Sequence, residues 1–285
     1  MKAGFEYFPA PAKLNLFLHV TGRRPDGYHL LQTVFRLLDY GDEVGFRIRQ
    51  DGEIRRTGRI RGIADDHDLT LRAAHLLRSV SGSRMGADID LIKRLPVGGG
   101  LGGGSSDAAT ALVALNELWE AGLSVEELAQ LGLKIGADVP VFVHGWSAWA
   151  EGVGEKLTPV QVPEDWFLVV HPGCDVSTAR IFNDPDLTRN TPPITIRDFL
   201  AGAGHNDCEP VVFSAYPEVA RASAWLGQWS PPRMTGTGSC LYARFGTREA
   251  AMEILAQLPQ PWQGFVARGK CRSPLLDRLE QERRE

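Results

Sequence analysis

The chain has 285 residues, which is enough for one large domain or two modest ones with a proper hydrophobic core. Apolar residues make up 43% and charged residues 23%, values that exclude a disordered or fibrous protein. A formal net charge of −4 and a pI near 6.0 give no reason to expect a nucleic acid or an anionic membrane as partner.

The sequence contains no signal for a membrane span, a leader or a metal cluster. No apolar run approaches the roughly 18 residues that a spanning helix needs. Pro9, Pro11 and Lys13 interrupt the apolar start, which therefore lacks the core of a signal peptide. The four cysteines form no CxxC pair and the seven histidines no HxxxH pair, so neither a zinc site nor a disulfide scaffold is predicted. We expect a cytoplasmic protein whose thiols stay reduced.

The first predicted element is a strand over residues 12–20, in which the side chains alternate between two faces. Leucine and valine side chains occupy one face. The opposite face carries Lys13, Asn15, Phe17 and His19. The pattern predicts a half-buried strand, with Lys13 and Asn15 side by side on the less apolar face.

The rest of the first half alternates between short strands and helices. The predicted elements are a turn at 24–27, a strand around 44–48, a helix over 69–80, a short strand that ends at 89–93, a helix over 107–121 and a helix from 124 to about 133. Asp68 is in position to cap the first helix, and Ser124 with Glu127 forms a capping box on the last.

The pattern of predicted elements changes after Pro159 and Pro163. The predicted elements are a strand over 166–171, a proline- and asparagine-rich stretch over 183–193, helices between 208 and 227, a glycine loop at 235–239, a strand over 240–245, a helix over 247–257 and a strand over 264–268. This order is typical of an α+β domain with an antiparallel sheet. We therefore predict two domains, residues 1–160 and residues 161–285.

A glycine-rich loop before the helix over 107–121 is the strongest functional signal. It consists of Gly98, Gly99, Gly100, Leu101, Gly102, Gly103, Gly104, Ser105 and Ser106. Bare backbone N–H groups beside a helix N-terminus form a cradle for anions, and glycine lets a triphosphate approach the backbone closely. A flexible linker is the alternative, but linkers rarely place six glycines directly before a strong helix.

Two familiar nucleotide-binding motifs fit this loop only in part. In the P-loop pattern GxxxxGK[ST], Gly98, Gly103 and Ser105 align, but Gly104 stands where the lysine belongs. The dinucleotide pattern GxGxxG requires an acidic residue about 20 positions later, at the end of a second strand. Here that distance falls at residues 117–120, inside a predicted helix. The loop is expected to bind phosphate in a third way, with a cation from another part of the chain.

Three other patches offer the groups that phosphoryl transfer needs. Lys13 is the candidate cation, although a lysine on an alternating strand is usually just solvated. Asp138 is the candidate base, because the apolar run 139–143 that follows it predicts partial desolvation. A helix cap or a turn is an equally good interpretation of Asp138. The segment 233–239 again interleaves glycine with small hydroxyl residues, and a tight turn before a strand is its alternative.

Taken in order, these patches resemble the GHMP kinase superfamily, whose members phosphorylate small metabolites with ATP and Mg²⁺. The matching strings are PAKLNL at 11–16, RPDGYH at 24–29, KRLPVGGGLGGGSSDAA at 93–109, GADVP at 136–140 and TGTGS at 235–239. The resemblance extends over nearly the whole chain. It implies an N-terminal ATP-binding domain with a mixed sheet, a C-terminal ferredoxin-like α/β domain, and an active site in the cleft between them.

The resemblance also implies roles for the residues that match. Asp138 would accept the proton of the substrate hydroxyl, Lys13 would keep Asp138 ionised and stabilise the transferring phosphate, and Asn15 would orient the hydroxyl. The loop 98–106 would hold the phosphates of ATP. The nucleotide pocket would be completed by Asp68, Lys93, Pro96 and Val97, and the third glycine motif by Thr235, Gly236, Thr237, Gly238 and Ser239.

The match is sharper with one branch of the superfamily, whose substrate is a cytidine diphosphate-linked sugar alcohol. In that branch an aromatic sandwich and a histidine recognise the cytosine, and stacking on a base contributes about 1–3 kcal/mol. The matching positions here are Tyr28, His29 and Phe182, with Thr178 nearby. Kinases of another small alcohol, such as homoserine or mevalonate, remain an alternative, as does a nucleotide-binding module without catalysis.

Two details of the nucleotide pocket stay open at this point. Asp68 stands where the branch has an asparagine near the adenine, and an ionised carboxylate can only accept hydrogen bonds. The magnesium ligands are not identified by the resemblance. Ser105 or Ser106 can serve, and so can phosphates and water alone.

Overall fold

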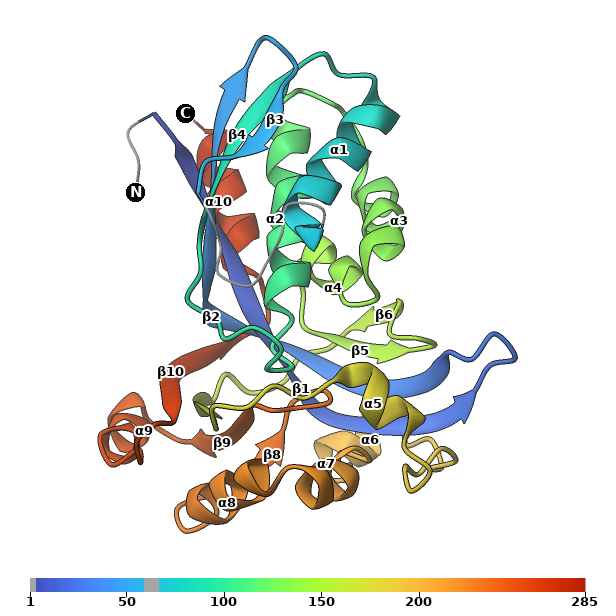
Figure 1. Cartoon of the computed structure of the whole chain (residues 1–285), viewed down its shortest axis with the longest axis vertical. Coiled ribbons are helices and arrows are strands. Elements are labelled where there is room, and N and C mark those ends of the chain that lie inside the picture. Colours follow the sequence, from blue (N-terminus) through green and yellow to red (C-terminus); the bar gives the residue numbers. More distant parts are fainter. Residues whose placement is uncertain (1–3, 59–66, 285) are drawn as a thin grey trace.

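The computed structural model describes residues 4–58 and 67–284 (Figure 1). The outer limits of the two predicted domains, residues 1 and 285, lie outside these ranges, and the division near residue 160 stays a prediction. Across the described ranges, no helix combines the length and the apolar character that crossing a membrane requires.

The first half of the chain contains six strands and four helices within the described residues. They are β1 (Glu6–Arg23), β2 (His29–Arg49), β3 (Ile54–Arg56), α1 (Leu69–Ser81), β4 (Gly86–Ile92), α2 (Gly103–Leu118), α3 (Val125–Ile135), α4 (Val139–His144), β5 (Ala148–Glu151) and β6 (Lys156–Pro159). The second half contributes β7 (Trp166–His171), α5 (Thr178–Asn183), α6 (Ile196–Leu200), α7 (Glu209–Ala215), α8 (Pro217–Leu226), β8 (Arg233–Met234), β9 (Leu241–Phe245), α9 (Arg248–Leu255), β10 (Gln263–Lys270) and α10 (Pro274–Glu282).

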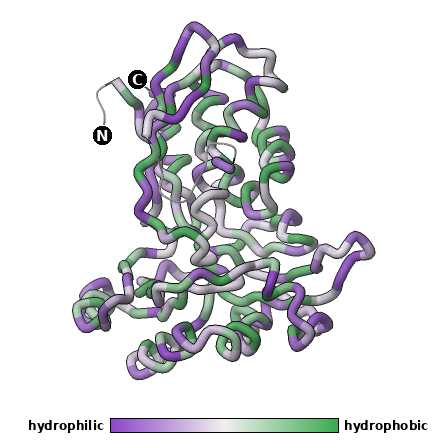
Figure 2. The backbone as a smooth tube through the Cα atoms, viewed as in Figure 1, coloured by the Kyte–Doolittle hydropathy of each residue, from purple (hydrophilic) through white to green (hydrophobic). Residues whose placement is uncertain are grey.

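The long antiparallel hairpin of β1 and β2 connects the upper and lower parts of the molecule in Figure 1. Helices α1 to α4 and α10 pack around its upper part, and α5 to α9 lie below. The predicted turn at 24–27 closes the hairpin, with the Gly27 N–H donating to the Arg24 carbonyl at 3.0 Å. Figure 2 shows hydrophilic residues at this hairpin tip, away from the junction.

Strand β1 is buried on both faces, so the prediction of a half-buried strand over 12–20 was wrong. Lys13, Asn15, Phe17 and His19 are at most 3% exposed. Segments from the second half of the chain cover the less apolar face. The Phe17 ring packs against Phe199 with ring centroids 5.4 Å apart, and the His19 ring lies 4.5 Å from that of His205. The alternation of side chains within one strand could not reveal that segments distant in the sequence bury its less apolar face.

The predicted helix starts are confirmed wherever a local cap sets them. Asp68 caps α1 through the Thr70 N–H at 2.8 Å, and Ser124 and Glu127 form the expected capping box on α3. The prediction that α2 starts at residue 107 was wrong, because the helix begins at Gly103 after Gly102 in the left-handed conformation. The second half of the glycine loop is therefore the first helical turn.

Strands from both halves of the chain form one hydrogen-bonded sheet, in which the order of neighbours is β3-β4-β2-β10-β7-β9-β8. The predicted antiparallel pairing of the second half is confirmed for β7, β8, β9 and β10. Strand β10 continues past β7 to pair with Leu37 and Leu38 of β2. Helix α10, which the sequence analysis missed, then returns to the core formed by α1 to α4, where Leu275 and Leu279 are buried.

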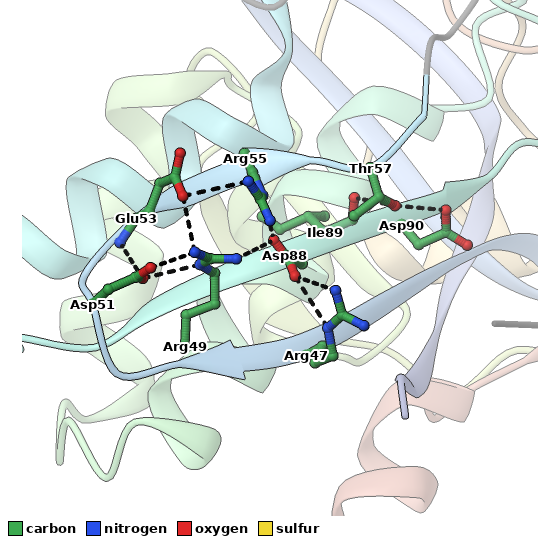
Figure 3. Close-up of polar contacts among 9 residues, drawn as sticks. All are labelled: Arg47, Arg49, Asp51, Glu53, Arg55, Thr57, Asp88, Ile89 and Asp90. Carbon is green, nitrogen blue, oxygen red and sulfur yellow. Dashed lines mark hydrogen bonds and ion pairs between the residues drawn. The ribbon is translucent and has the colours of Figure 1, made fainter. Parts of the chain in front are cut away.

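A buried carboxylate organises the outer corner of the sheet (Figure 3). Asp88 in β4 is 1% exposed and accepts hydrogen bonds from Arg47 at 2.6 Å, Arg55 at 2.7 Å and Arg49 at 3.2 Å. Burial alone would raise the pKa of Asp88, but the hydrogen bonds from Arg47 and Arg55 outweigh it and lower this pKa. One carboxylate thus ties β2 and the short edge strand β3 to β4.

Replacing Asp88 by alanine should lower the free energy of unfolding by about 2 kcal/mol at neutral pH, because three guanidinium groups lose their shared partner. The figure lies below the range for fully buried pairs because Arg47 and Arg55 are half exposed. The contribution is present above the unfolded-state pKa of about 4 and is lost as the pH falls through the lower folded-state pKa. Urea denaturation at pH 7 and pH 3 measures it. Asp51→Ala, which removes an exposed member of the network, is the control, and an equal loss there would contradict the assignment.

Candidate active site

The glycine loop is clamped between β1 and the segment 235–239. The Lys13 N–H donates to the Leu101 carbonyl at 2.9 Å, and the Cys240 N–H donates to the Gly99 carbonyl at 3.1 Å. At Gly100, φ is 76° and a Cβ atom would lie 2.2 Å from the Thr235 carbonyl oxygen. Only glycine fits there, since a side chain would be strained and would also collide with backbone.

Lys13 and Asp138 meet at this loop. The Lys13 ammonium lies 3.2 Å from Asp138 Oδ2 and donates to Asn15 Oδ1 at 2.6 Å and to the Gly100 carbonyl at 3.1 Å. Lys13 is buried, so the interpretation of a solvated lysine was wrong. Asp138 occupies the N-cap position of α4, but its side chain makes no capping hydrogen bond. Its carboxylate therefore faces the lysine, and it is 34% exposed.

Asn15 is held in one orientation by its neighbours. Its Oδ1 accepts from Lys13, and its Nδ2 donates to Thr33 Oγ1 at 3.0 Å, so oxygen and nitrogen of the amide are assigned by their partners. Thr235 Oγ1 accepts from the Asn15 N–H at 3.0 Å and donates to the Gly100 carbonyl at 3.1 Å. The turn at 235–239 exists as well, with the Gly238 N–H donating to the Thr235 carbonyl at 3.0 Å.

Two cavities adjoin at the glycine loop and share Gly100, Gly102 and Ser105. The first, of about 720 Å³, is also lined by Lys13, Asn15, Tyr28, His29, Asp138, Thr178, Phe182, Gly236 and Thr237. The second, of about 520 Å³, is also lined by Asp68, Lys93, Pro96, Val97, Gly98, Gly99, Leu101, Gly103, Gly104 and Asp107. Ser106, Thr235, Gly238 and Ser239 were predicted as site residues but line neither cavity. Two ligands can thus meet at the loop, near Lys13 and Asp138.

The far wall of the first cavity carries the residues predicted to recognise a base. Phe182 stacks on His29 with ring centroids 4.9 Å apart and 22° between the planes, while Tyr28 is 64% exposed. The Thr178 and Thr237 hydroxyls are 2.9 Å apart. Burial, together with the charges of Arg189 and Arg23, lowers the pKa of His29. A base sandwiched between Tyr28 and Phe182 stays a prediction.

The second cavity holds a buried charge cluster that the sequence analysis missed. The Lys93 ammonium bonds Asp107 Oδ2 at 2.8 Å and also Asp42 Oδ2, and Asp42 accepts the Arg94 N–H at 2.6 Å. Burial lowers the pKa of Lys93, but the charges of Asp107 and Asp42 outweigh it and raise this pKa. Burial raises the pKa of Asp107 to about 7. Asp42 and Lys93 lie 51 positions apart, so no local sequence pattern indicated the cluster.

Asp68 lines the second cavity with both carboxylate oxygens already engaged. Oδ1 accepts from the Thr70 N–H, and Oδ2 pairs with Arg56 at 2.7 Å. The pair is buried, with each side chain at most 5% exposed. Asp68 therefore has a demonstrated capping and charge-pairing role, and its contact with an adenine stays a prediction.

Comparison with known proteins assigns this geometry to a family. Residues 68–146 match the N-terminal domain of GHMP kinases. The 4-diphosphocytidyl-2-C-methyl-D-erythritol kinase of Alkalilimnicola ehrlichii is 60% identical over 276 residues, covering 97% of this chain and 95% of that protein. The chain belongs to this family of GHMP kinases.

Solved structures agree with this assignment. A crystal structure of 4-(cytidine 5'-diphospho)-2C-methyl-D-erythritol kinase has a TM-score of 0.81 and 30% identity, covering 93% of this chain and 99% of that one. A mevalonate kinase structure, with 17% identity, a TM-score of 0.68 and coverage of 93% and 99%, shares the fold alone. The predicted α+β fold of the GHMP kinases is confirmed.

Replacing Lys93 by methionine should leave Asp42 and Asp107 buried side by side without a cation. We expect a loss of about 3 kcal/mol in the free energy of unfolding at pH 8, the cost of breaking a buried ion pair. A raised carboxyl pKa means that the ionised form of Asp107 is disfavoured in the folded state, so the loss should shrink at pH 5, where Asp107 is protonated.

Chemical denaturation at both pH values measures this effect. Arg94→Met is the matched control, because Arg94 is the next residue and its side chain pairs with Glu43 while 45% exposed. Its loss should stay within about 0.5 kcal/mol. A pH-independent loss for Lys93→Met would contradict the assigned role of Asp107.

Proposed function

We propose that this protein transfers the γ-phosphate of ATP to the 2-hydroxyl of 4-diphosphocytidyl-2-C-methyl-D-erythritol, a step of the non-mevalonate route to isoprenoid precursors. The observation that carries the proposal is the pair of cavities that share Gly100, Gly102 and Ser105 beside Lys13 and Asp138. The identity of the substrate is inferred from the family to which the chain belongs. The first cavity, with an aromatic wall at its far end, has the size of a typical small-molecule site.

In the proposed mechanism the substrate hydroxyl lies in the first cavity beside Asp138 and attacks the γ-phosphorus across the glycine loop. Its proton passes to the Asp138 carboxylate as the new O–P bond forms, and the bond to the β-phosphate oxygen breaks to release ADP. Lys13, which already pairs with Asp138, stabilises the charge on the transferring group. Asn15 fixes the lysine through its Oδ1.

The triphosphate would lie in the second cavity, where the N-terminus of α2 and the glycine backbone present N–H donors. Lys93 cannot act as a free counter-ion there, because its ammonium is already bound by Asp42 and Asp107. Among the described residues, the positive end of the α2 dipole faces this cavity, and Lys13 lies on the first cavity's side of the shared loop, where the transferring group develops its charge. A metal ion would add positive charge at the phosphates.

Mg²⁺ fits the oxygen donors of the second cavity. Asp107 lines it with Oδ1 buried and without a hydrogen-bond partner, and the Ser105 hydroxyl lies at the shared edge. We propose Asp107 and Ser105 as the residues that would hold the ion, since Mg²⁺ prefers one or two carboxylates plus phosphate oxygens. When bound, it neutralises charge on the phosphates.

An ADP-release assay with ATP and Mg²⁺ tests the substrate. We expect turnover of the cytidylated substrate and none of homoserine or mevalonate, because those small alcohols carry no base for the wall formed by Tyr28, His29 and Phe182. Turnover of homoserine or mevalonate alone would overturn the substrate assignment while leaving a kinase. No turnover of any of the three would favour a nucleotide-binding module.

The catalytic pair is tested by Lys13→Met and Asp138→Asn. Each should lower kcat by about 10²- to 10⁴-fold, because positioned proton transfer and charge stabilisation are lost. ATP affinity and melting temperature should change little, since Asp138 is partly exposed and methionine keeps the apolar stem of Lys13. Asp186→Asn, at an exposed position outside both cavities, is the control. Near-normal rates in both variants would refute the mechanism.

A further inference from the structure

An arginine outside the first cavity holds one of the residues of its wall. Arg189 follows α5 and lines neither cavity. Its Nε–H donates to His29 Nε2 at 3.2 Å. Its other nitrogens donate to the backbone carbonyls of Phe182 at 2.9 Å, Asp184 at 2.6 Å and Leu187 at 3.0 Å. The guanidinium thus joins the start of β2 to the segment that carries Phe182.

The chemistry of arginine fixes the state of the histidine. A guanidinium group is always protonated and has five donors but no acceptor. His29 Nε2 must therefore be the bare, accepting nitrogen. The two charged groups that act on the ring, Arg189 and Arg23, add to burial in lowering its pKa, so the ring is neutral at pH 7. In a neutral imidazole the proton then resides on Nδ1.

The remaining nitrogen is free to serve a ligand. Within the described residues, His29 Nδ1 has no hydrogen-bond partner, and His29 lines the first cavity. An Nδ1–H group is a donor only, so it favours a base edge that presents an acceptor. The O2 carbonyl accepts hydrogen bonds in both bases, so this donor separates cytosine from uracil only at N3, which is a bare acceptor in cytosine and carries a proton in uracil.

We propose that Arg189 is a positioning residue that fixes His29 as the Nδ1–H tautomer and thereby makes the site select cytosine over uracil. The inference rests on the proposed function for the identity of the ligand. The tautomer itself follows from the contacts of the free protein. A purely structural Arg189 would hold Phe182 and α5 in place without influencing which base binds.

The tautomer is measured on the full chain labelled with ¹⁵N-histidine, by two-bond ¹H–¹⁵N correlation spectra at pH 7.5 without ligand. The His29 signals are assigned by their loss in His29→Gln. We expect a protonated Nδ1 and a bare Nε2 in the unmodified protein, and a mixture of both neutral tautomers in Arg189→Met. An Nε2–H tautomer or an imidazolium ring in the unmodified protein would overturn the proposal, whatever the enzyme phosphorylates.

Selectivity is measured by calorimetric titration with cytidine diphosphate and uridine diphosphate, while ADP saturates the second cavity. The unmodified protein should prefer the cytidine ligand, and Arg189→Met should reduce that preference about fivefold at pH 8, because the Nδ1–H tautomer is then only part of a mixture and the apparent affinity falls with its fraction. The preference should partly return once the pH is low enough to protonate the ring, because an imidazolium ring again donates from Nδ1.

Arg180→Met is the matched control. Arg180 lies on α5, but its guanidinium lies over the Tyr216 ring at 5.3 Å and it lines neither cavity. We expect it to bind both diphosphates as the unmodified protein does. An equal, pH-independent weakening of both ligands in Arg189→Met would show a structural role alone and overturn the selectivity claim. If the unmodified protein did not turn over the cytidylated substrate, the proposed function would be refuted, while the tautomer result would still stand.

Discussion

The contact between the glycine loop and the Thr235 turn is the constraint on which the site depends. The Thr235 carbonyl comes so close to Gly100 that any side chain there would collide with it, and the Thr235 hydroxyl bridges Gly100 to Asn15. Three segments far apart in the chain are thereby fixed at one point. Lys13 donates to Gly100 and Asn15 from the same place, so the position of its ammonium follows from this packing. The two cavities adjoin here for the same reason.

Buried charge is distributed unevenly between the two cavities. In the first, Lys13 faces a partly exposed carboxylate, so the pair stays accessible to a substrate. In the second, Lys93 is shared by two buried carboxylates, and its charge serves the fold. The same residue type thus has opposite roles on the two sides of one loop. The difference lies in burial and in the number of anionic partners. A buried lysine that is already paired with two carboxylates attracts a further anionic ligand only weakly.

Local features of the sequence predicted local structure well. Asp68 caps α1, and Ser124 with Glu127 caps α3, because a cap involves residues two or three positions apart. The start of α2 was predicted too late because glycine is a poor helix former, yet Gly103 begins the helix with tertiary support from the segments packed on the loop. The burial of both faces of β1 and the return of α10 to the first half were missed, since both depend on distant segments.

The sequence by itself determined the superfamily and hence which residue types are proposed to carry the chemistry, because the ordered strings around Lys13, the glycine loop, Asp138 and Thr235 are specific to that superfamily. It could not determine which of them meet. The tertiary structure decided that Asp138 faces Lys13 instead of capping α4, that Lys93 is paired with Asp42 and Asp107, and that Arg189 lies against His29. The physical reason is the separation along the sequence over which each interaction acts. Capping and periodicity act within a few residues, whereas a pairing such as that of His29 and Arg189, 160 positions apart, exists only once the chain has folded.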